Sequence, residues 1–410
     1  MRVLMSAYSC EPGGGSEDGV GWMWASLAAA DHDVWILTRE NNAPAIEAAL
    51  AADPSLGLHP IYLDLPKWAR FWKKGLRGHR TYYSLWQLAA RRQAERLLQS
   101  QAFDVVHHIT WASDSMPASV VGVGGIPSVW GPVGGSQTMP RELYRWLSPR
   151  SKAGEIGRTL WLGLLRRLIG QRAAERADVV VALNGVVRDR FLPFAAHLEV
   201  RPNVVVDIDE VAAIRASVAD GPLTRTSTEY RAVYAGRLLA WKGLRLAIEA
   251  LARPEASNWS LDVFGKGPYL AEAKKHVHRL GLEGRVQFRA RIPRDELLAE
   301  VAAADAMLHP SMHDSSPWSV GEAVMVGTPV VCLDYAGPSA IIGSSGGVAV
   351  PVSGDVPAAL AQGLRDVQGR RVATDEWSAA QVAPLLAHWY ATAITIAASR
   401  DSSFAEPAAA

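Results

Sequence analysis

The sequence predicts an α/β protein with two doubly wound domains, each built on a parallel sheet. Short apolar runs rich in β-branched residues alternate with helical patterns, which is typical of βαβ units. This alternation occurs twice along the chain. With 410 residues, of which 49% are hydrophobic, the chain is long enough to form two separate cores.

The expected strands are short apolar runs, most of them bounded by charged residues, Gly or Pro. In the first half they cover 2–8, 33–39, 104–110, 127–133 and 178–184. In the second half they cover 231–236, 260–265, 285–291, 306–311 and 329–334. Nearly continuous apolar runs indicate strands that are buried on both faces, so helices should cover both sides of each sheet.

The same patterns predict the domain boundaries. Residues 1–197 would form the first domain and residues 198–375 the second. Residues 376–398 predict an amphipathic helix that is kinked at Pro384 and crosses back to the first domain. Residues 399–410 offer little to pack and are expected to be disordered.

Composition excludes several classes of protein. A formal net charge of +1 provides no field to attract nucleic acid, and no nucleic-acid motif is found. Cys10 and Cys332 are the only cysteines, which suits a reducing compartment. We find neither a signal-peptide pattern nor an apolar run of about 18 residues, so a cytoplasmic location is expected.

The stretch 313–331 predicts a helix entrance that can bind an anion. Ser316 is placed to cap the helix, and Pro317 suits its first position. Free backbone N–H groups near Trp318 and Ser319, together with the helix dipole, favour a phosphate there.

Glu322 lies inside the same helix, and its side chain should lean toward the entrance. A carboxylate beside a phosphate is useful where it accepts hydrogen bonds from the same ligand, as from neighbouring ribose hydroxyls. The alternative is a surface helix on which Glu322 is merely solvated.

Arg237 and Lys242 form a second basic element. Arg237 directly follows an expected strand, and Lys242 opens the next helix, so both charges emerge at the carboxyl end of that strand. Two basic residues in a loop are usually solvated. Beside an anion site in the same domain, they instead predict a clamp for a diphosphate.

The second half resembles the retaining glycosyltransferase family 4, whose members have the two-domain GT-B fold. Four motifs carry the resemblance in the family's order: GRLLAWKG, GKGP, ADAMLHPS, and the acidic pair Asp314 and Glu322. The first half matches more loosely, through SCEPGGGSEDGVGW and PNVVVDID. The chain departs from the family at Asp314, where family members usually have Glu followed by Gly, an aromatic residue and Gly. This departure leaves the donor sugar open.

The resemblance implies two Rossmann-like domains that face each other across a cleft, with the acceptor on the first and the donor on the second. Arg237 and Lys242 would hold the diphosphate. Glu322 would bind the ribose and Asp314 the donor sugar. Glycines in the GKGP motif would let the base approach the backbone closely. The other implied donor contacts are Gly14, Gly15, Gly265, Gly267, Arg291, Ile292, Ser315, Ser316, Trp318 and Ser319.

The resemblance also implies no metal and no cofactor, because basic residues and the helix entrance supply the positive charge. The sequence shows no cluster of histidine ligands. His107 and His108 are neighbours on an expected strand and should point to opposite faces, which makes them a poor metal pair. Either one of them lines the acceptor site or they pack beneath the sheet.

Two segments, 66–92 and 144–168, mix basic and aromatic residues, and the first contains no acidic residue. Such segments fit a membrane surface or an acidic-lipid site. The alternative is a solvated helix face whose aromatic residues enter the core. A lipid-linked acceptor suits the first interpretation, and a saccharide or natural product suits the second.

The predicted function is a retaining glycosyltransferase that moves a sugar from a nucleotide-diphosphate sugar to an acceptor hydroxyl. Peripheral contact with the inner face of the membrane is part of the membrane interpretation. A nucleotide-sugar 2-epimerase of the same architecture is one alternative, although it should carry further acid and base residues. A non-catalytic protein that binds sugar nucleotides or saccharides is the other, because of the departure at Asp314.

Overall fold

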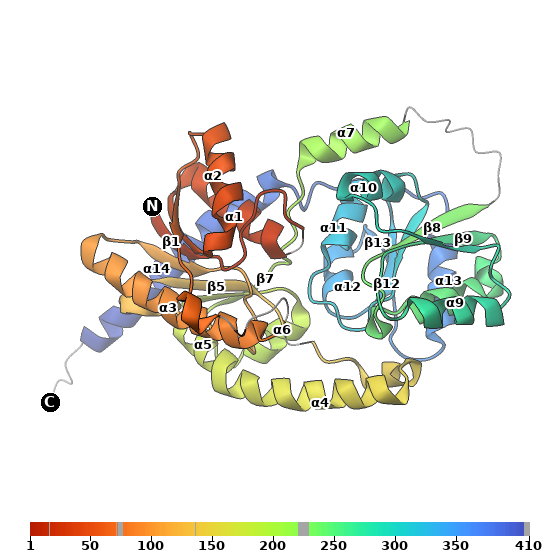
Figure 1. The fold of residues 1–410 in the computed structure, drawn as a ribbon, viewed down its shortest axis with the longest axis horizontal. Coiled ribbons are helices and arrows are strands. Elements are labelled where there is room, and N and C mark those ends of the chain that lie inside the picture. Colours follow the sequence, from red (N-terminus) through yellow and green to blue (C-terminus); the bar gives the residue numbers. More distant parts are fainter. Residues whose placement is uncertain (16, 71, 73–76, 136, 220–228, 406–410) are drawn as a thin grey trace. The chain divides into compact units, whose positions relative to one another are not determined.

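The computed structural model describes residues 1–405 except 16, 71, 73–76, 136 and 220–228. The chain divides into two compact units, each with its own parallel sheet (Figure 1). Unit 1 contains Met1–Ser136, Leu160–Val205 and Ala380–Ala410, and unit 2 contains Gln137–Thr159 and Val206–Ala379.

Unit 1 is built on a seven-stranded parallel sheet with the strand order β3-β2-β1-β4-β5-β6-β7. The strands are β1 (Arg2–Ser6), β2 (Asp33–Thr38), β3 (Leu58–Tyr62), β4 (Val105–His108), β5 (Ser128–Val133), β6 (Val179–Ala182) and β7 (Leu198–Val200). The order reverses between β1 and β4, as in doubly wound nucleotide-binding folds.

The helices of unit 1 bury aromatic side chains against this sheet. They are α1 (Glu17–Asp31), α2 (Ala43–Ala52), α3 (His79–Ser100), α5 (Gln171–Arg176), α6 (Gly185–Phe191) and α14 (Ala379–Ala405). One buried cluster centres on Trp86 of α3, and another joins Trp130 of β5 to Phe191 of α6. The helix α4 (Pro149–Leu165) begins in unit 2 and ends in unit 1.

Unit 2 repeats the design with six parallel strands in the order β10-β9-β8-β11-β12-β13. The strands are β8 (Tyr230–Ala235), β9 (Trp259–Phe264), β10 (Val286–Arg289), β11 (Ala306–His309), β12 (Val330–Leu333) and β13 (Gly347–Val350). The helices are α7 (Ile208–Ala219), α8 (Leu244–Leu251), α9 (Leu270–Arg279), α10 (Arg294–Ala302), α11 (Trp318–Met325), α12 (Gly337–Ile342) and α13 (Val356–Asp366). One large cluster, which includes Leu246, Trp259 and Leu308, forms the core.

The ten expected strands are confirmed, with small shifts at their ends. The structure adds β3, β7 and β13, and each of these lies at the edge of its sheet. An edge strand has one neighbour only, so it does not need a continuous apolar run. Pro60 interrupts β3, β7 has three residues, and Gly347 opens β13.

The domain boundaries differ from the expected ones at 137–159, which belong to unit 2 and not to the first domain. Leu143 and Leu147 enter the core of unit 2. The hydroxyl of Tyr335 also donates to the backbone carbonyl of Thr138 at 2.5 Å. Burial of these apolar side chains holds the segment to the second sheet.

The C-terminal helix also differs from expectation. α14 runs through Pro384 without dividing and continues past 399, so most of the expected tail is helical. Residues 406–410 lie outside the described residues. Pro384 stands near the start of the helix, where few preceding carbonyls are affected. The indole of Trp389 stacks on that of Trp24 in α1, with 5.5 Å between the ring centroids, and this contact fixes α14 to unit 1.

Among the described residues, Ala379–Arg400 is the one segment long and apolar enough to cross a membrane by length and composition. The expectation that no segment meets this criterion is therefore wrong. Core helices of soluble proteins pass the same test. Val382, Leu386, Trp389 and Tyr390 are buried, so one face of this helix packs against unit 1.

The aromatic residues of the basic segment 66–92 differ in their burial. Tyr82, Tyr83 and Trp86 of α3 are fully buried, as the packing interpretation requires, whereas Trp68 is 78% exposed. Phe71, Lys73 and Lys74 lie outside the described residues.

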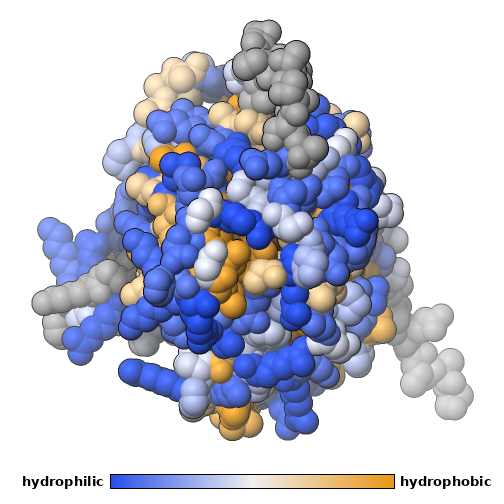
Figure 2. Space-filling model, turned by 90° about the vertical axis from the view of Figure 1, so that its right-hand side faces the viewer, coloured by the Kyte–Doolittle hydropathy of each residue, from blue (hydrophilic) through white to orange (hydrophobic). Residues whose placement is uncertain are grey.

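Exposed apolar side chains gather on α4 and the turn that follows it. Ile156, Leu160, Trp161, Leu164 and Leu168 are each about half exposed or more. The face of the molecule shown in Figure 2 is, in contrast, mainly hydrophilic, with only small hydrophobic areas.

His107 and His108 are both buried in β4. The Nε2–H of His107 donates to the carbonyl of Gly131 at 2.8 Å, and its Nδ1 accepts from the Tyr390 hydroxyl at 3.0 Å. His108 Nε2 lies 3.2 Å from the Tyr83 hydroxyl. This placement agrees with the interpretation in which the two histidines pack beneath the sheet. A role of either histidine in binding an acceptor stays a prediction.

Buried neutral histidines should make the protein sensitive to acid. Burial lowers the pKa of His107 to about 4 and that of His108 to about 3. In the unfolded chain both would titrate near about 6.5, so the unfolded state binds more protons below that pH. Stability should therefore fall as the pH drops from about 6.5 toward 4.

His107→Gln removes one of the two histidines that take up a proton on unfolding, and its side-chain amide can still donate an N–H to the carbonyl oxygen of Gly131. Between pH 6.5 and 4.5, the free energy of unfolding of this variant should fall less steeply than that of the wild type. The difference should be about 1.4 kcal/mol per pH unit, the value of one proton. Urea unfolding at several pH values measures it. Parallel slopes for the two proteins would contradict the assignment of a neutral, buried His107.

Candidate functional site

The candidate site lies in unit 2, at the carboxyl ends of β8, β9, β10 and β11. The strand order reverses between β8 and β11, and ligands of open α/β sheets bind at such a switch point. Backbone hydrogen bonds connect the loops there. Leu238 N donates to Lys266 O at 3.1 Å, and Met312 N donates to Trp241 O at 2.9 Å. The loop after β8 is thus held between those after β9 and β11.

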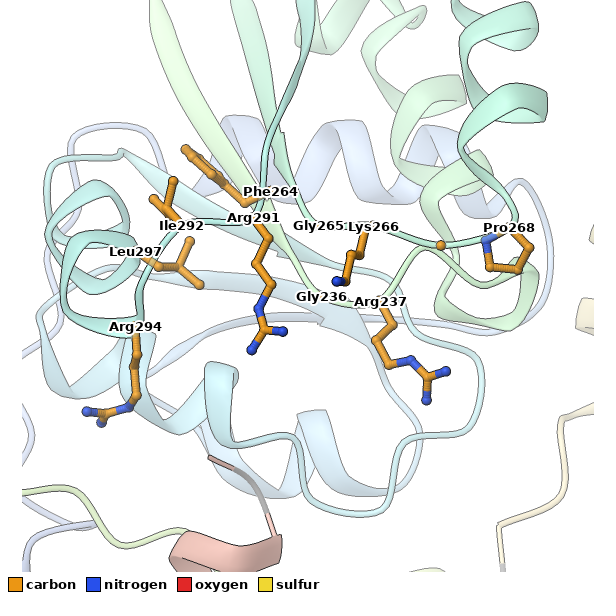
Figure 3. A pocket seen from close by; sticks show the side chains of 11 residues that line it. Gly236, Arg237, Phe264, Gly265, Lys266, Pro268, Arg291, Ile292, Arg294 and Leu297 are labelled. Atoms are coloured by element: carbon orange, nitrogen blue, oxygen red, sulfur yellow. The ribbon is translucent and has the colours of Figure 1, made fainter. Parts of the chain in front are cut away.

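A pocket of about 610 Å³ opens beside these loops (Figure 3). Five residues predicted as donor contacts line it together, namely Arg237, Gly265, Gly267, Arg291 and Ile292. The other lining residues are Gly236, Phe264, Lys266, Pro268, Arg294 and Leu297. Among the described residues, the lining holds four cationic side chains and no carboxylate.

The guanidinium groups of Arg237, Arg291 and Arg294 extend to the same side of the loops (Figure 3). Among the residues that the structure describes, Arg237, Lys266 and Arg291 have no ion-pair partner within 4.0 Å. Their charge is therefore available to a ligand. An uncompensated group of three cations around a cavity of this size favours an anion such as a diphosphate.

Gly265 and Gly267 are required by the packing of the loops. A Cβ atom on Gly265 would lie 1.9 Å from the carbonyl oxygen of Gly236, and one on Gly267 would lie 2.3 Å from that of Leu238. The expected reason, close approach of a base to the glycine backbone, is thus not needed to explain these two residues. The contact that excludes a side chain is with the neighbouring loop of the same unit.

Lys242 and Asp314 form an ion pair at the switch point. Lys242 Nζ donates to both carboxylate oxygens of Asp314, at 2.7 and 2.6 Å. His309 Nε2, at the end of β11, lies 3.1 Å from the same carboxylate. The two residues predicted to hold the diphosphate and the sugar therefore bind each other in this structure.

The environment of this pair fixes its charge. Burial by itself would raise the pKa of Asp314, but the Lys242 ammonium and the hydrogen bond from His309 outweigh it and hold the pKa well below its usual range. Burial lowers the pKa of His309, although Asp314 opposes that effect. Asp314 is consequently ionised over the whole physiological range.

Glu322 is a buried carboxylate with a partner, and not a solvated one. Arg294 Nε donates to Glu322 Oε1 at 2.7 Å, and its Nη1 donates to Glu210 Oε1 at 2.6 Å. Burial raises the pKa of Glu322, while the charge of Arg294 works against it. Because Arg294 also lines the pocket, this ion pair connects Glu322 to the pocket.

The entrance of α11 begins later than expected. Pro317 occupies the N-cap position, and no side chain caps the helix. Ser316 is therefore not the cap, and its buried hydroxyl has no hydrogen-bond partner among the described residues. Ser315 instead donates to Gln137 Oε1 at 2.5 Å, which draws the loop toward the segment before α4. Trp318 and Ser319 open the helix as predicted.

Gly14 and Gly15 precede α1 in unit 1. A Cβ atom on Gly14 would lie 2.9 Å from Glu11 O and from Asp18 Cβ, whereas Gly15 has open space around it. Nearby, the carboxylate of Glu17 accepts from the backbone N–H of Trp111 at 2.5 Å. A role for the two glycines toward the donor stays a prediction.

Sequence reasoning missed several residues of the site. Lys266 stands inside the GKGP motif, and its charge next to the glycines was a signal that could have found it. Arg294 follows the predicted pair Arg291 and Ile292 by two residues. His309 belongs to the ADAMLHPS motif, where nothing in the sequence tells that its ring turns toward Asp314.

The Lys242–Asp314 pair should contribute strongly to stability. Lys242→Met or Asp314→Asn leaves a largely buried charge without its partner and should lower the free energy of unfolding by about 3 kcal/mol. The double variant should lose less than the sum of the two. Asp314 has a lowered pKa in the folded state, so its contribution is complete above about pH 4 and disappears as the pH falls below that value.

Urea unfolding between pH 3 and 7 tests this expectation. Asp355→Asn is a matched control, because Asp355 pairs with the exposed Arg253 and Asn still caps α13. The control should lose less than about 1 kcal/mol. Equal losses for Asp314→Asn and the control would contradict the buried pair.

Comparison with known proteins finds matches in the segment that contains this pocket. The family model of the glycosyl transferases group 1 matches residues 220–370, which include the pocket and both ion-paired acidic residues. A 2-deoxystreptamine glucosyltransferase from Streptomyces kanamyceticus is 34% identical over 106 residues, which are 25% of this chain and 27% of that protein. A D-inositol 3-phosphate glycosyltransferase from Streptomyces avermitilis is 27% identical over 287 residues, or 64% and 57% of the two chains.

The matches thus span between about a quarter and three fifths of the length of these two relatives. Among solved structures, the Anabaena protein Alr3699/HepE in complex with UDP is similar, with a TM-score of 0.53 and 17% identity. The likeness covers 98% of this chain and 99% of that one. The two doubly wound parallel sheets therefore have the two-domain GT-B fold, and residues 220–370 match the glycosyl transferases group 1.

Proposed function

We propose that this protein is a retaining glycosyltransferase of family 4 that transfers a sugar from a nucleotide-diphosphate sugar to an acceptor hydroxyl. The observation that carries the proposal is the pocket of unit 2, where three cations without ion-pair partners among the described residues surround a cavity of about 610 Å³. The match of the surrounding segment to the glycosyl transferases group 1 supports it.

In this proposal the pocket binds the nucleotide diphosphate of the donor. The bond that breaks joins the anomeric carbon of the donor sugar to the diphosphate. Arg237, Lys266 and Arg291 stabilise the negative charge that develops on the diphosphate as this bond breaks. The acceptor hydroxyl attacks the anomeric carbon from the same face and passes its proton to the departing phosphate, so the anomeric configuration is kept. Because protein cations supply the positive charge, no metal ion is needed.

The two ion pairs would exchange partners when the donor binds. A phosphate that takes over the ammonium of Lys242 releases Asp314, whose carboxylate can then accept hydrogen bonds from hydroxyls of the donor sugar. In the same way Glu322, held by Arg294, is positioned to accept from the ribose. The pairs keep these four side chains ordered before the donor arrives, which reduces the entropy cost of binding.

UDP is the first nucleotide to test, since the similar Anabaena structure is a complex with UDP. Arg291→Ala should raise the dissociation constant of UDP about tenfold or more, the effect of losing a charge-assisted contact. Arg289→Ala is the matched control, because Arg289 ends strand β10, two residues before Arg291, and pairs with Asp262. Calorimetry in the presence of EDTA measures both variants. Identical constants for the two variants, or UDP and GDP binding only when a metal is added, would contradict the proposal.

Turnover separates the proposal from its alternatives. With donor and acceptor supplied, NMR should show a product whose anomeric configuration equals that of the donor, and Lys242→Ala or Glu322→Ala should slow its formation about tenfold. A nucleotide-sugar 2-epimerase would convert the donor without any acceptor. A binding protein would bind the donor and leave it unchanged.

For the acceptor, the exposed apolar residues of α4 favour a substrate at a membrane surface. Arg150, Arg167 and Arg172 are exposed beside them, and Glu155, the only acidic residue between 149 and 171, is buried and paired with Arg158. Exposed apolar side chains flanked by positive charge fit a bilayer that contains anionic lipids. Lipid-linked glycans are reached at such a surface, whereas saccharides and natural products are reached in solution.

Vesicle sedimentation tests this contact. The protein should sediment with vesicles that contain phosphatidylglycerol more than with neutral ones, and Leu160→Ser with Leu164→Ser should weaken binding about tenfold. Leu88→Ser, at an exposed position of α3, is the control and should bind like the wild type. Binding that the double variant retains in full would exclude α4 as the contact.

A further inference from the structure

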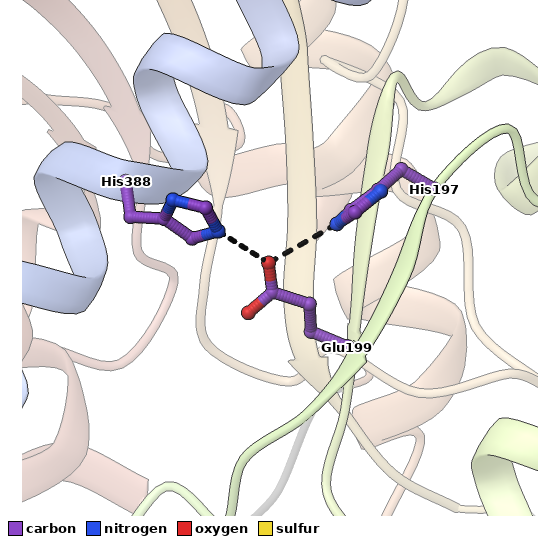
Figure 4. Close-up of side chains that lie close together, drawn as sticks. All are labelled: His197, Glu199 and His388. Atoms are coloured by element: carbon purple, nitrogen blue, oxygen red, sulfur yellow. Dashed lines mark hydrogen bonds and ion pairs between the residues drawn. The ribbon is translucent and has the colours of Figure 1, made fainter.

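We infer that His197, Glu199 and His388 form a site for a zinc-type divalent metal ion, which joins helix α14 to strand β7. The site goes beyond the proposed function, since it lies in unit 1 and shares no residue with the pocket of unit 2. The sequence showed no cluster of histidine ligands because His388 is 189 residues from Glu199. The structure brings the three side chains together (Figure 4).

The backbone directs all three ligands to one point. His197 and Glu199 are two residues apart at β7, and residues with this spacing on a strand face the same side of the sheet. β7 is the last strand of its sheet, paired with β6 on one side only. His388 reaches the same point from α14, which packs on unit 1 through Trp389.

The distances bring the three ligand atoms close enough together to surround one metal ion. His197 Nε2 lies 3.1 Å and His388 Nε2 lies 2.9 Å from the same oxygen, Glu199 Oε1. All three ligand atoms lie within 4.8 Å of one another. In a tetrahedral zinc site with bonds of about 2.0–2.1 Å, ligand atoms stand about 3.3 Å apart. Ligand atoms that lie up to 4.8 Å apart would have to approach one another by as much as about 1.5 Å to complete the site.

The ligand types select the metal. Two imidazoles and one carboxylate suit zinc and similar late transition metals, whereas magnesium and calcium prefer oxygen ligands alone. The three side chains are between about a quarter and three fifths exposed, so water can occupy the remaining coordination position.

Trp389 holds Glu199 in place for this role. Its indole Nε1–H donates to Glu199 Oε2 at 2.7 Å, which leaves Oε1 turned toward both histidines. Metal-binding carboxylates are commonly oriented by such a hydrogen bond from an outer residue. Trp389 is therefore a positioning residue of the site, and its stacking on Trp24 makes that position rigid.

Calorimetry with the full chain, free of any histidine tag and treated with a chelator, tests the site. Zn²⁺ should bind with one-to-one stoichiometry and raise the melting temperature. His388→Ala and Glu199→Gln should each weaken binding more than tenfold. Trp389→Phe keeps a stacking ring and loses the N–H, so it should weaken binding about 10- to 100-fold. His59→Ala removes an exposed histidine of unit 1 that pairs with one carboxylate, and it should bind Zn²⁺ like the wild type.

Co²⁺ provides a second measurement that does not depend on stability. Coordination by these ligands should give visible d–d absorption bands in the wild type and in His59→Ala, and these bands should be absent in His388→Ala. No saturable binding of Zn²⁺, or equal binding by the wild type and His388→Ala, would overturn the inference and leave Glu199 as an acceptor of hydrogen bonds only. Circular dichroism shows whether each variant is folded.

Discussion

The site of unit 2 depends on which of its cationic side chains are paired with carboxylates and which are not. Four cationic side chains line one pocket and a fifth, Lys242, stands close by in the chain. Buried carboxylates neutralise Lys242 and Arg294, while Arg237, Lys266 and Arg291 are left for a ligand. Full compensation would leave no attraction for a diphosphate, whereas without Asp314 the largely buried Lys242 would have no ion-pair partner. The observed division provides both folding and an anion site.

Close contact between loops makes this division possible. Glycines at 265 and 267 allow the loop after β9 to touch the backbone of the loop after β8. The basic residues are thus carried by a backbone that is fixed by hydrogen bonds, and not by free surface loops. Such preorganised charge is more effective in catalysis than charge that must first be ordered.

Sequence patterns predicted the parts of the structure that repeat or that lie at loop ends. Both sheets and five pocket residues, Arg237 among them, followed from strand patterns and motifs. The partner of each charge could not be predicted, because Lys242 and Asp314 are 72 residues apart and meet only through the strand order. Edge strands were missed since they lack a continuous apolar run. The metal-binding group was missed since it joins a strand and a helix from distant parts of the chain.

The path of the chain sets the order in which the two units are completed during synthesis. Unit 2 ends at Ala379, whereas unit 1 still needs α14, whose Tyr390 hydroxyl bonds to His107 inside the first sheet. On the ribosome, the second unit can fold while the first lacks this last piece. A message truncated shortly before codon 380 would therefore leave the first unit with an unfilled interior, although all seven of its strands have been made.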